Sequence, residues 1–256
     1  MGYENVILEK KGHVAVLTIN HPPANAVNMV TVLEFDKALD ELEHDKDVRV
    51  IIVTGAGEKG FCAGFDVSDV ANKDTCVPLG HRIWTRVNRF PKPVIAAING
   101  FALGGGCELA LASHFRLMVD APKAVIGLTE LNLGIIPGWG GCVRMANLLG
   151  RSKALDLILF SKKLTAPEAL AIGLIDKVSA PGEVMKDAME LAERIATRPP
   201  VAVKWVLNAI STAESVSMDE GLRLEVEGTK AVGRTQDAVE GFTAFFEKRQ
   251  PNFKGE

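Results

Sequence analysis

The sequence lacks a long apolar run and lacks a strong charge of either sign. No apolar stretch among its 256 residues approaches the roughly 20 residues that a bilayer span needs. Lys and Arg number 29, Asp and Glu number 32, and no long basic run provides an electrostatic footprint for nucleic acid. We therefore expect neither a membrane nor a nucleic acid among its partners.

Cysteine is scarce and is not arranged for metal binding. The cysteines form no CxxC pair, and no histidine stands at metal-ligand spacing from them. The first five residues also lack the basic and apolar regions of a signal peptide. We expect reduced thiols, a cytoplasmic location and no metal. The four cysteines are Cys62, Cys76, Cys107 and Cys142.

Apolar residues make up 47% of the chain, which is enough to bury one sizeable core and a smaller appendage. Strand and helix signals alternate in the first half, which predicts an α/β core. Helix signals dominate after residue 138, so we expect a helical subdomain at the end. The expected strands are residues 14–19, 48–53, 94–98, 115–119 and 124–126. The expected helices are residues 29–43, 79–90, 143–149, 152–160, 166–171, 182–196, 201–212, 218–232 and 235–248.

One glycine motif resembles a dinucleotide-binding turn but lacks its context. Gly55, Gly57 and Gly60 match G-x-G-x-x-G directly after an expected strand. The third glycine of such a motif opens a helix, whereas residues 61–66 continue as a loop with a further glycine. We interpret residues 55–69 as a glycine-rich loop rather than a nucleotide site.

The most informative segment is residues 97–108, AINGFALGGGCE. The apolar strand 94–98 leads into Gly104–Gly106, and Glu108 then opens a helix. Glycines let backbone N–H groups approach a ligand, and the start of a helix favours negative charge. A carboxylate beside such an anion site suits an enzyme that builds charge on a carbonyl oxygen while moving a proton.

A second glycine-rich turn, residues 61–66, leaves its strand through small residues in the same way. If the two turns lie side by side, each offers one N–H group to the same carbonyl oxygen. That arrangement is an oxyanion hole. The alternative is that these glycines serve only tight turns.

A second carboxylate candidate is Glu130, in the otherwise apolar stretch 124–136. Another glycine-rich approach to a helix, residues 138–141, follows it. An acidic side chain is costly to bury unless it is paired or used. The alternative is a surface or helix-capping glutamate.

The chain resembles the enoyl-CoA hydratase/isomerase (crotonase) family over essentially its whole length. The resemblance lies in residues 61–66, 93–110 and 129–141 and in the ending FFEKRQPNFK, residues 245–254. It implies an α/β fold, a spiral of ββα units over residues 1–198 that carries the active site. It also implies a C-terminal helical region, residues 199–256, that mediates trimerisation, with trimers often pairing as hexamers.

The resemblance implies an acyl-CoA thioester substrate and no metal or redox cofactor. The oxyanion donors would be the backbone N–H groups of Phe65 and Gly105. Hydratases of the family carry glutamate at both the Glu108 and the Glu130 positions, whereas simple isomerases usually keep only the second. Water would then add to the β-carbon, with Glu108 as its base and Glu130 as donor of the α-proton. The resemblance also implies substrate or CoA contacts at Ala24, Ala63, Asp66, Leu103, Pro137, Gly138, Trp139 and Lys248.

Four positions depart from the family pattern. His21 stands in a turn where a basic residue often contacts CoA phosphates, and Thr229 stands where an aromatic residue often touches the adenine. His114 stands where an aspartate is frequent, with a structural histidine whose hydrogen bonds are satisfied as the alternative. Trp139 stands where small residues are common. With Phe65 it would form an aromatic wall that favours a cyclic or bulky acyl group, or it would simply pack in the core.

These features predict an enoyl-CoA hydratase acting on a short or medium acyl chain. A hydratase of a cyclic dienoyl-CoA or a double-bond isomerase would use the same two carboxylates. A non-catalytic CoA-binding subunit is a further alternative, against which the presence of both glutamates argues.

Overall fold

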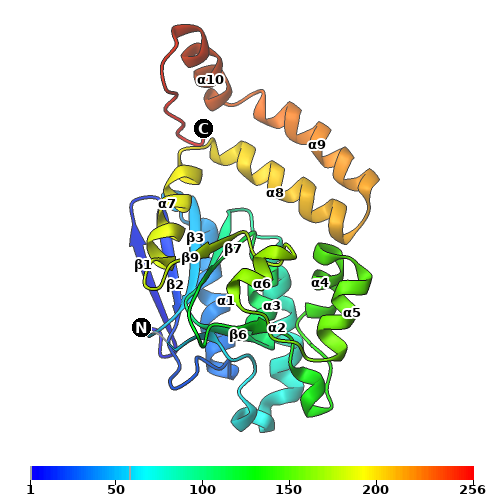
Figure 1. Cartoon of the computed structure of the whole chain (residues 1–256). Helices are drawn as coiled ribbons and strands as arrows, with labels where there is room; N and C mark the ends of the chain where they lie inside the picture. Colours follow the sequence, from blue (N-terminus) through cyan, green and yellow to red (C-terminus); the bar gives the residue numbers. More distant parts are fainter. Residues whose placement is uncertain (1, 58) are drawn as a thin grey trace.

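A computed structural model describes residues 2–57 and 59–256 of the chain. Its larger sheet has six strands in the order β1-β2-β3-β5-β7-β9 (Figure 1). Only the β1–β2 pair is antiparallel, and the other pairs are parallel. The strands are β1 (Val6–Lys11), β2 (Val14–Ile19), β3 (Val50–Gly55), β5 (Val94–Ile98), β7 (Phe115–Val119) and β9 (Lys177–Ser179).

A smaller parallel sheet consists of β4 (Gly60–Cys62), β6 (Phe101–Leu103) and β8 (Ile126–Gly127), in that order. Each of its strands directly follows a strand of the larger sheet, so β3–β4, β5–β6 and β7–β8 form a repeat. Helices α2 (Lys73–Asn88) and α3 (Gly105–Ala112) and the short 3₁₀ helix η2 (Glu130–Leu133) follow the three pairs. This repeat is the predicted spiral of ββα units.

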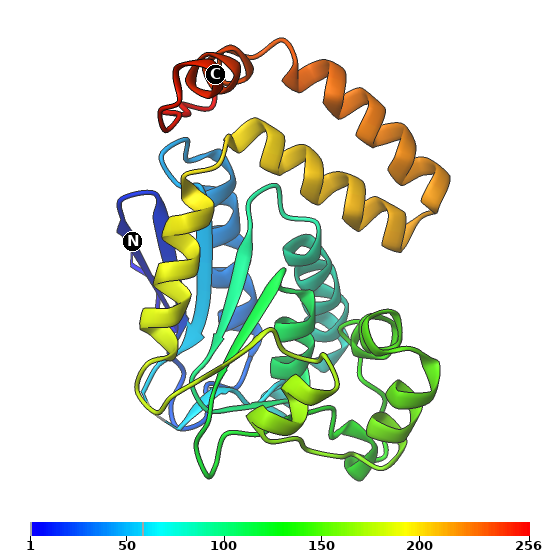
Figure 2. The ribbon, with the colours of Figure 1, turned by 45° about the horizontal axis from the view of Figure 1, so that its top comes forward.

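The central strands are buried on both faces, which explains their continuous apolar sequences. Every residue of β3 and of β5 is buried. Helix α7 (Val184–Ala196) packs on one face of the larger sheet, and α1 (Met29–His44) lies on the other (Figure 2). This covered sheet is the rigid support from which the site segments project.

Several local expectations were wrong. The glycine triplet follows β6 rather than β5, and α3 begins at Gly105, three residues before Glu108. The expected loop 55–69 contains β4 and the start of η1 (Val67–Asn72), and α2 begins at Lys73 with Pro78 inside it. Strands β1 and β9 were not expected. In the described part of the G-x-G-x-x-G motif, the third glycine begins a strand, which contradicts a dinucleotide turn.

Three helices, α8 (Pro200–Ser215), α9 (Met218–Val232) and α10 (Gln236–Glu247), follow the core. Figures 1 and 2 show α8 and α9 side by side and α10 at the far end from the smaller sheet. The segment after α10 returns to the core, where Arg49 donates hydrogen bonds to the carbonyl oxygens of Ala196 and Phe253 at 2.9 Å each. The division of the chain at residues 198 and 199 stays a prediction.

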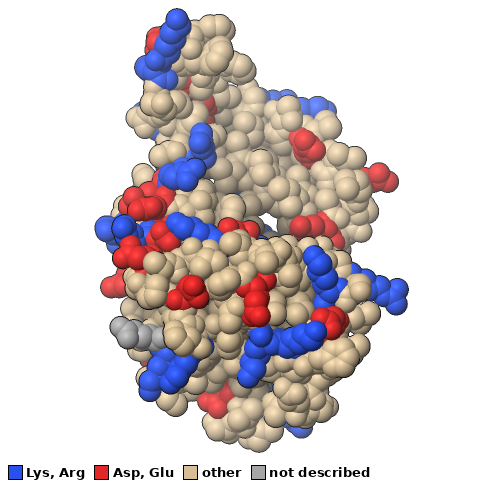
Figure 3. Space-filling model, viewed as in Figure 1, with Lys and Arg blue, Asp and Glu red and all other residues tan. Residues whose placement is uncertain are grey.

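Lys and Arg side chains are interspersed with Asp and Glu on the face shown in Figure 3. Within residues 2–57 and 59–256, no helix has the length and apolarity that crossing a bilayer requires. The remaining helices are α4 (Gly141–Leu149), α5 (Arg151–Leu159) and α6 (Ala166–Ala171).

Candidate active site

The two glycine-rich turns meet at Gly64 and Gly105. Gly64 has a φ of +89°, and a Cβ there would lie 2.6 Å from the backbone nitrogen of Gly105 and 2.9 Å from the carbonyl oxygen of Leu103. Only glycine permits both this φ and this approach. The side-by-side arrangement of the two turns, which the sequence left as a hypothesis, is therefore present.

The backbone N–H groups of Phe65 and Gly105 are both open beside this contact. Val27 and Phe65 form an isolated parallel β-bridge. The Val27 N–H donates to the carbonyl oxygen of Gly64 at 2.7 Å, and the Val27 carbonyl oxygen accepts from the N–H of Asp66 at 3.0 Å. In this pattern the N–H of Phe65, which lies between them, points away from Val27. Gly105 is the first residue of α3, where N–H groups have no partner within the helix. Within the described part of the chain, neither N–H group has a hydrogen-bond acceptor.

Glu108 lies in the first turn of α3 and is 2% exposed. Its Oε1 accepts hydrogen bonds from the backbone N–H groups of Trp139 at 2.7 Å and Gly141 at 2.8 Å. A Cβ at Gly141 would lie 2.9 Å from Cγ of Glu108, so glycine is needed for this contact. A third glycine-rich segment therefore binds Oε1 of Glu108. These two hydrogen bonds do not involve Oε2.

Glu130 is the first residue of η2 and is 8% exposed, so the surface alternative was wrong. Its Oε1 lies 3.1 Å from where a Cβ on Gly104 would stand, which sets the carboxylate against the glycine triplet. Its Oε2 is buried and has no hydrogen-bond partner within the described residues. A buried carboxylate oxygen without a partner is costly unless it holds a proton or meets a ligand.

Burial raises the pKa of both carboxyl groups. The pKa of Glu108 rises to about 7, because desolvation and the charge of Glu130 outweigh the two N–H groups that favour the anion. Desolvation also raises the pKa of Glu130, against the backbone N–H groups of Thr129 and Glu130 itself. Two buried carboxyl groups that titrate toward neutral pH, with open N–H donors beside them, suit proton transfer.

Aromatic rings pack directly against Gly105 and Phe65. Trp139 is 2% exposed, and its ring centroid lies 6.4 Å from that of Phe65 and 5.4 Å from that of Trp84. A Cβ at Gly105 would lie 2.3 Å from Cζ3 of Trp139. The indole of Trp139 is thus part of the core, as the packing alternative predicted, although it also contacts Phe65.

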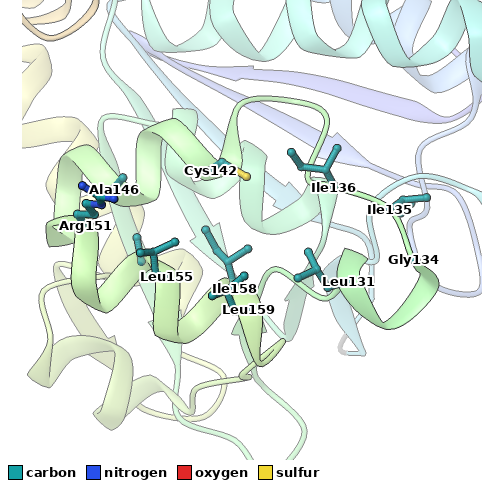
Figure 4. Close-up of a pocket in the computed structure, with 11 residues that line it drawn as sticks. Leu131, Gly134, Ile135, Ile136, Cys142, Ala146, Arg151, Leu155, Ile158 and Leu159 are labelled. Atoms are coloured by element: carbon teal, nitrogen blue, oxygen red, sulfur yellow. The ribbon is translucent and has the colours of Figure 1, made fainter.

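An apolar pocket of about 820 Å³ borders η2, which carries Glu130, and α4, which begins at the Glu108 partner Gly141. Leu131 follows Glu130, Cys142 follows Gly141, and both residues line the pocket. Figure 4 shows aliphatic side chains of α5 facing those of the segment between η2 and α4. The pocket offers apolar space against these two segments, and neither glutamate is among its lining residues.

The sequence profile described as enoyl-CoA hydratase/isomerase matches residues 9–256. The chain belongs to this family. It is 43% identical to a short-chain-enoyl-CoA hydratase of Clostridium acetobutylicum, over 98% of this chain and 97% of that protein. It is 40% identical to a crotonyl-CoA hydratase of Syntrophomonas wolfei, over 99% of each. The crystal structure of an enoyl-CoA hydratase from Bacillus anthracis superposes with a TM-score of 0.94 at 38% identity, over 99% of this chain and 100% of that one.

Within this enoyl-CoA hydratase/isomerase fold, the predicted catalytic and oxyanion residues Glu108, Glu130, Phe65 and Gly105 come together. Ala63 donates a hydrogen bond to the carbonyl oxygen of Ala24 at 3.2 Å, so two predicted CoA contacts are also neighbours.

Other predicted contact residues have structural partners. The Asp66 carboxylate accepts from the N–H of Ser68 at 2.9 Å and caps η1. The carbonyl oxygen of Gly138 lies 3.1 Å from Nδ1 of His81. Pro137 precedes Gly138 in the segment that leads to α4. Contacts of these residues with CoA stay predictions.

Lys248 is not brought to the site of its own chain. It ends α10 with a φ of +54°, and Figures 1 and 2 place α10 far from the smaller sheet. Thr229 lies in α9, where its hydroxyl donates to the carbonyl oxygen of Glu225 at 2.9 Å. His21 lies near the site turn, with Nδ1 at 3.9 Å from Oδ2 of Asp66.

His114 packs against the start of β5. Its backbone N–H donates to the Val94 carbonyl at 2.8 Å, and its Nδ1 accepts from the Val94 N–H at 2.9 Å. Burial and the nearby charge of Arg116 lower its pKa to about 4. The neutral ring therefore carries its proton on Nε2, a buried atom without a partner in the described structure. The Nδ1 contact fits a structural histidine, whereas the buried Nε2 does not fit a fully satisfied one.

Sequence reasoning missed Gly64, Gly141 and Trp84. Gly64 admits the neighbouring turn, Gly141 donates to Glu108, and Trp84 donates to the carbonyl oxygen of Gly105. The glycine-rich run 138–141 was recognised as an approach to a helix, but a backbone donor has no sequence signature.

Proposed function

We propose that the protein is an enoyl-CoA hydratase that adds water across the 2,3 double bond of an enoyl-CoA thioester and catalyses the reverse dehydration. The observation that carries this proposal is the pair of buried carboxylates, Glu108 and Glu130, beside two open backbone N–H groups. The names of the relatives, a short-chain-enoyl-CoA hydratase and a crotonyl-CoA hydratase, support it.

In the proposed mechanism, the thioester oxygen accepts hydrogen bonds from the N–H groups of Phe65 and Gly105. Addition at the β-carbon pushes negative charge onto this oxygen as an enolate, which these donors stabilise more than they stabilise the substrate. Losing one donor of this kind costs about 3–4 kcal/mol.

Glu108 is the proposed base for the water. Because Oε1 is held by two N–H groups, Oε2 is free to take a proton as the water oxygen bonds to the β-carbon. A pKa of about 7 keeps both protonation states accessible near neutral pH.

Glu130 is the proposed donor of the α-proton. Its partnerless Oε2 is suited to hold that proton, which passes to the α-carbon as the enolate collapses to the thioester. The proton on Glu108 then leaves to solvent, and Glu130 regains one. Every proton and electron pair is accounted for by water, the thioester and these residues, so the proposed reaction uses no metal or redox cofactor.

We propose that the active form is a homotrimer or a dimer of trimers, with Lys248 contacting CoA across subunits. Three exposed phenylalanines on one segment support an interface there: Phe242, Phe245 and Phe246. Phe245 and Phe246 stand directly before the end of α10 at Lys248. A cytoplasmic location is likewise proposed, and the four free thiols support it.

The direct test is a panel of enoyl-CoA substrates with short, medium and cyclic acyl groups. Hydration removes the conjugated double bond, so the enone absorbance should fall and mass spectrometry should show the gain of one water. The double variant Glu108→Gln/Glu130→Gln is the matched inactive control. A wild-type protein that hydrates none of the panel would end the proposal, and conversion of a substrate without water gain would indicate an isomerase.

A further inference from the structure

Trp84 lies beneath the oxyanion turn and has no part in the mechanism above. It projects from α2, its side chain is wholly buried, and its Nε1–H donates to the carbonyl oxygen of Gly105 at 2.9 Å. The residue that supplies one proposed oxyanion donor is thus held by an indole from another helix.

Gly105 needs such support, because it stands in a run of three glycines. Glycine has no Cβ to restrict its backbone, so the orientation of its N–H depends on its neighbours. On one side Gly64 touches it, with 3.2 Å between the Cα of Gly64 and the Cβ position of Gly105. On another side the Trp139 ring is so close that a Cβ on Gly105 would overlap it at 2.3 Å.

Helix α2 holds the Trp139 ring as well. Gly80 precedes Trp84 by four residues and so lies on the same face of α2. A Cβ at Gly80 would lie 2.5 Å from Cε2 of Trp139, so this glycine forms the slot for the indole. The rings of Trp84 and Trp139 then meet edge to face, with centroids 5.4 Å apart.

Phe35 of α1 completes a row of rings that we call the aromatic row: Phe35, Trp84, Trp139 and Phe65. Its centroid lies 5.1 Å from that of Trp84. The row ends at Phe65, the second proposed oxyanion residue, and the backbone N–H of Trp139 binds Glu108. The aromatic row therefore contacts both proposed oxyanion residues, Phe65 and Gly105, and includes Trp139, which binds Glu108.

We propose that Trp84 is a positioning residue for the reaction, whose indole N–H orients Gly105 so that the Gly105 amide faces the thioester oxygen. This inference rests on the proposed function. An oxyanion donor is effective only when its direction is fixed before charge develops. Without the indole N–H, the Gly105 carbonyl loses a directional bond and the amide on the other side of the same Cα becomes freer to turn.

The sharpest variant replaces Trp84 with 3-benzothienylalanine, in which sulfur substitutes for the indole N–H at nearly constant shape. Trp84→Phe is a second, genetically simple variant. Phe90→Leu is the control, because Phe90 is 1% exposed and lies outside the aromatic row. The readouts are kcat and KM with crotonyl-CoA, the thermal midpoint, and the near-ultraviolet absorbance of bound acetoacetyl-CoA, whose enolate form oriented oxyanion donors should stabilise.

For the benzothienyl variant, we expect kcat to fall on the order of tenfold. The enolate absorbance should fall with it, while KM and the affinity for butyryl-CoA stay close to wild type and the thermal midpoint falls no further than in Phe90→Leu. Trp84→Phe should show the same spectroscopic loss, and Phe90→Leu should lower the thermal midpoint without it.

Wild-type kcat and enolate absorbance in the benzothienyl variant would overturn the inference. So would an equal loss of enolate absorbance in Phe90→Leu at a matched thermal midpoint. Failure of the proposed function is distinguishable, because the wild-type protein itself would then neither hydrate crotonyl-CoA nor enhance the enolate absorbance.

Discussion

The segments that carry Glu108 and Glu130 occupy equivalent places in successive ββα units, yet they treat their carboxylates differently. Each glutamate lies in the first turn of a helix that follows a strand of the smaller sheet: Glu108 in α3 after β6, and Glu130 in η2 after β8. Glu108 has one oxygen bound by two N–H groups, whereas Glu130 has a buried oxygen without a partner in the described structure. The ββα repeat positions both glutamates in the same way. They differ because N–H groups of a third segment, residues 139–141, donate hydrogen bonds to Glu108.

This inequality suggests a division of work. Hydrogen bonds from N–H groups favour the charged form of a carboxylate, and a partnerless oxygen favours the protonated form. This difference supports the proposed roles of Glu108 as the base and Glu130 as the acid, within a pair whose pKa values are both raised by burial and whose protons are shared in titration. The predictions below test the difference between the two segments.

The largest effect is expected from replacing either glutamate. Glu108→Gln and Glu130→Gln should each lower kcat by about 10²–10⁴-fold, since each removes a proton-transfer group. The double variant should be little slower than either single variant, because the two residues act as a unit. Crotonyl-CoA hydration measures all three.

Deuterium exchange separates the two roles. Exchange of the α-protons of butyryl-CoA in D₂O needs only the α-proton group and the oxyanion donors. It should persist in Glu108→Gln and disappear in Glu130→Gln. The opposite pattern would reverse the assignment of acid and base.

A second prediction concerns stability and pH. The pKa of Glu108 rises from 4.5 to about 7 on folding, so between these values the folded state holds a proton that the unfolded state has released. Raising the pH through this window should therefore lower the free energy of unfolding, by about 3 kcal/mol in full. Glu108→Gln should lack this decrease.

Urea unfolding of wild type and Glu108→Gln, at one protein concentration and several pH values, measures the difference. Identical pH slopes in the two proteins would show that Glu108 ionises as an ordinary exposed carboxyl group does. Activity should also decline below about pH 7 as Glu108 becomes protonated.

The smallest effect is expected from disturbing the segment that binds Glu108. In Gly141→Ala, the new methyl group would stand 2.9 Å from Cγ and 3.0 Å from Oε1 of Glu108, and 2.9 Å from Cδ2 of Leu128. The carboxylate must shift, and kcat should fall roughly tenfold with little change in KM. Steady-state kinetics with crotonyl-CoA measure this split.

The matched control is Gly150→Ala, between α4 and α5. Gly150 has a φ of +83° and no atom within 4 Å of its Cβ position, so alanine adds backbone strain without touching the site. It should lower stability by about 1 kcal/mol and leave kcat near wild type. Equal activity losses in both variants would remove the special role of the Glu108 anchor.

Much of the large sheet was predictable because its strands are continuous apolar runs. Residues 14–19 and 94–98 form β2 and β5 with the expected bounds, and the helices at 166–171 and 218–232 also match. The site turns were predictable because three glycines before a glutamate are unusual. In the smaller sheet, the expected strand at residues 124–126 overlaps β8 at one residue, and β4 and β6 were missed because strands of three residues show no periodicity.

The remaining site features depend on long-range contacts that no local pattern records. The N–H donors to Glu108 come from more than 30 residues away, at separations of 31 and 33. The Trp84 indole reaches Gly105 across 21 residues. A tryptophan on an apolar helix face predicts core packing, and nothing in its sequence neighbours indicates that it binds a carbonyl group.

The contact between Gly64 and Gly105 has a consequence for how such an enzyme changes over time. The proposed charge-stabilising groups at this contact belong to the main chain, so replacement of the Phe65 side chain leaves its amide in place. The carboxylate residues on the neighbouring segments could be substituted one at a time while the two amides still bind the thioester oxygen. New reactions on acyl thioesters would then require few mutations, provided that Gly64 and Gly105 are kept.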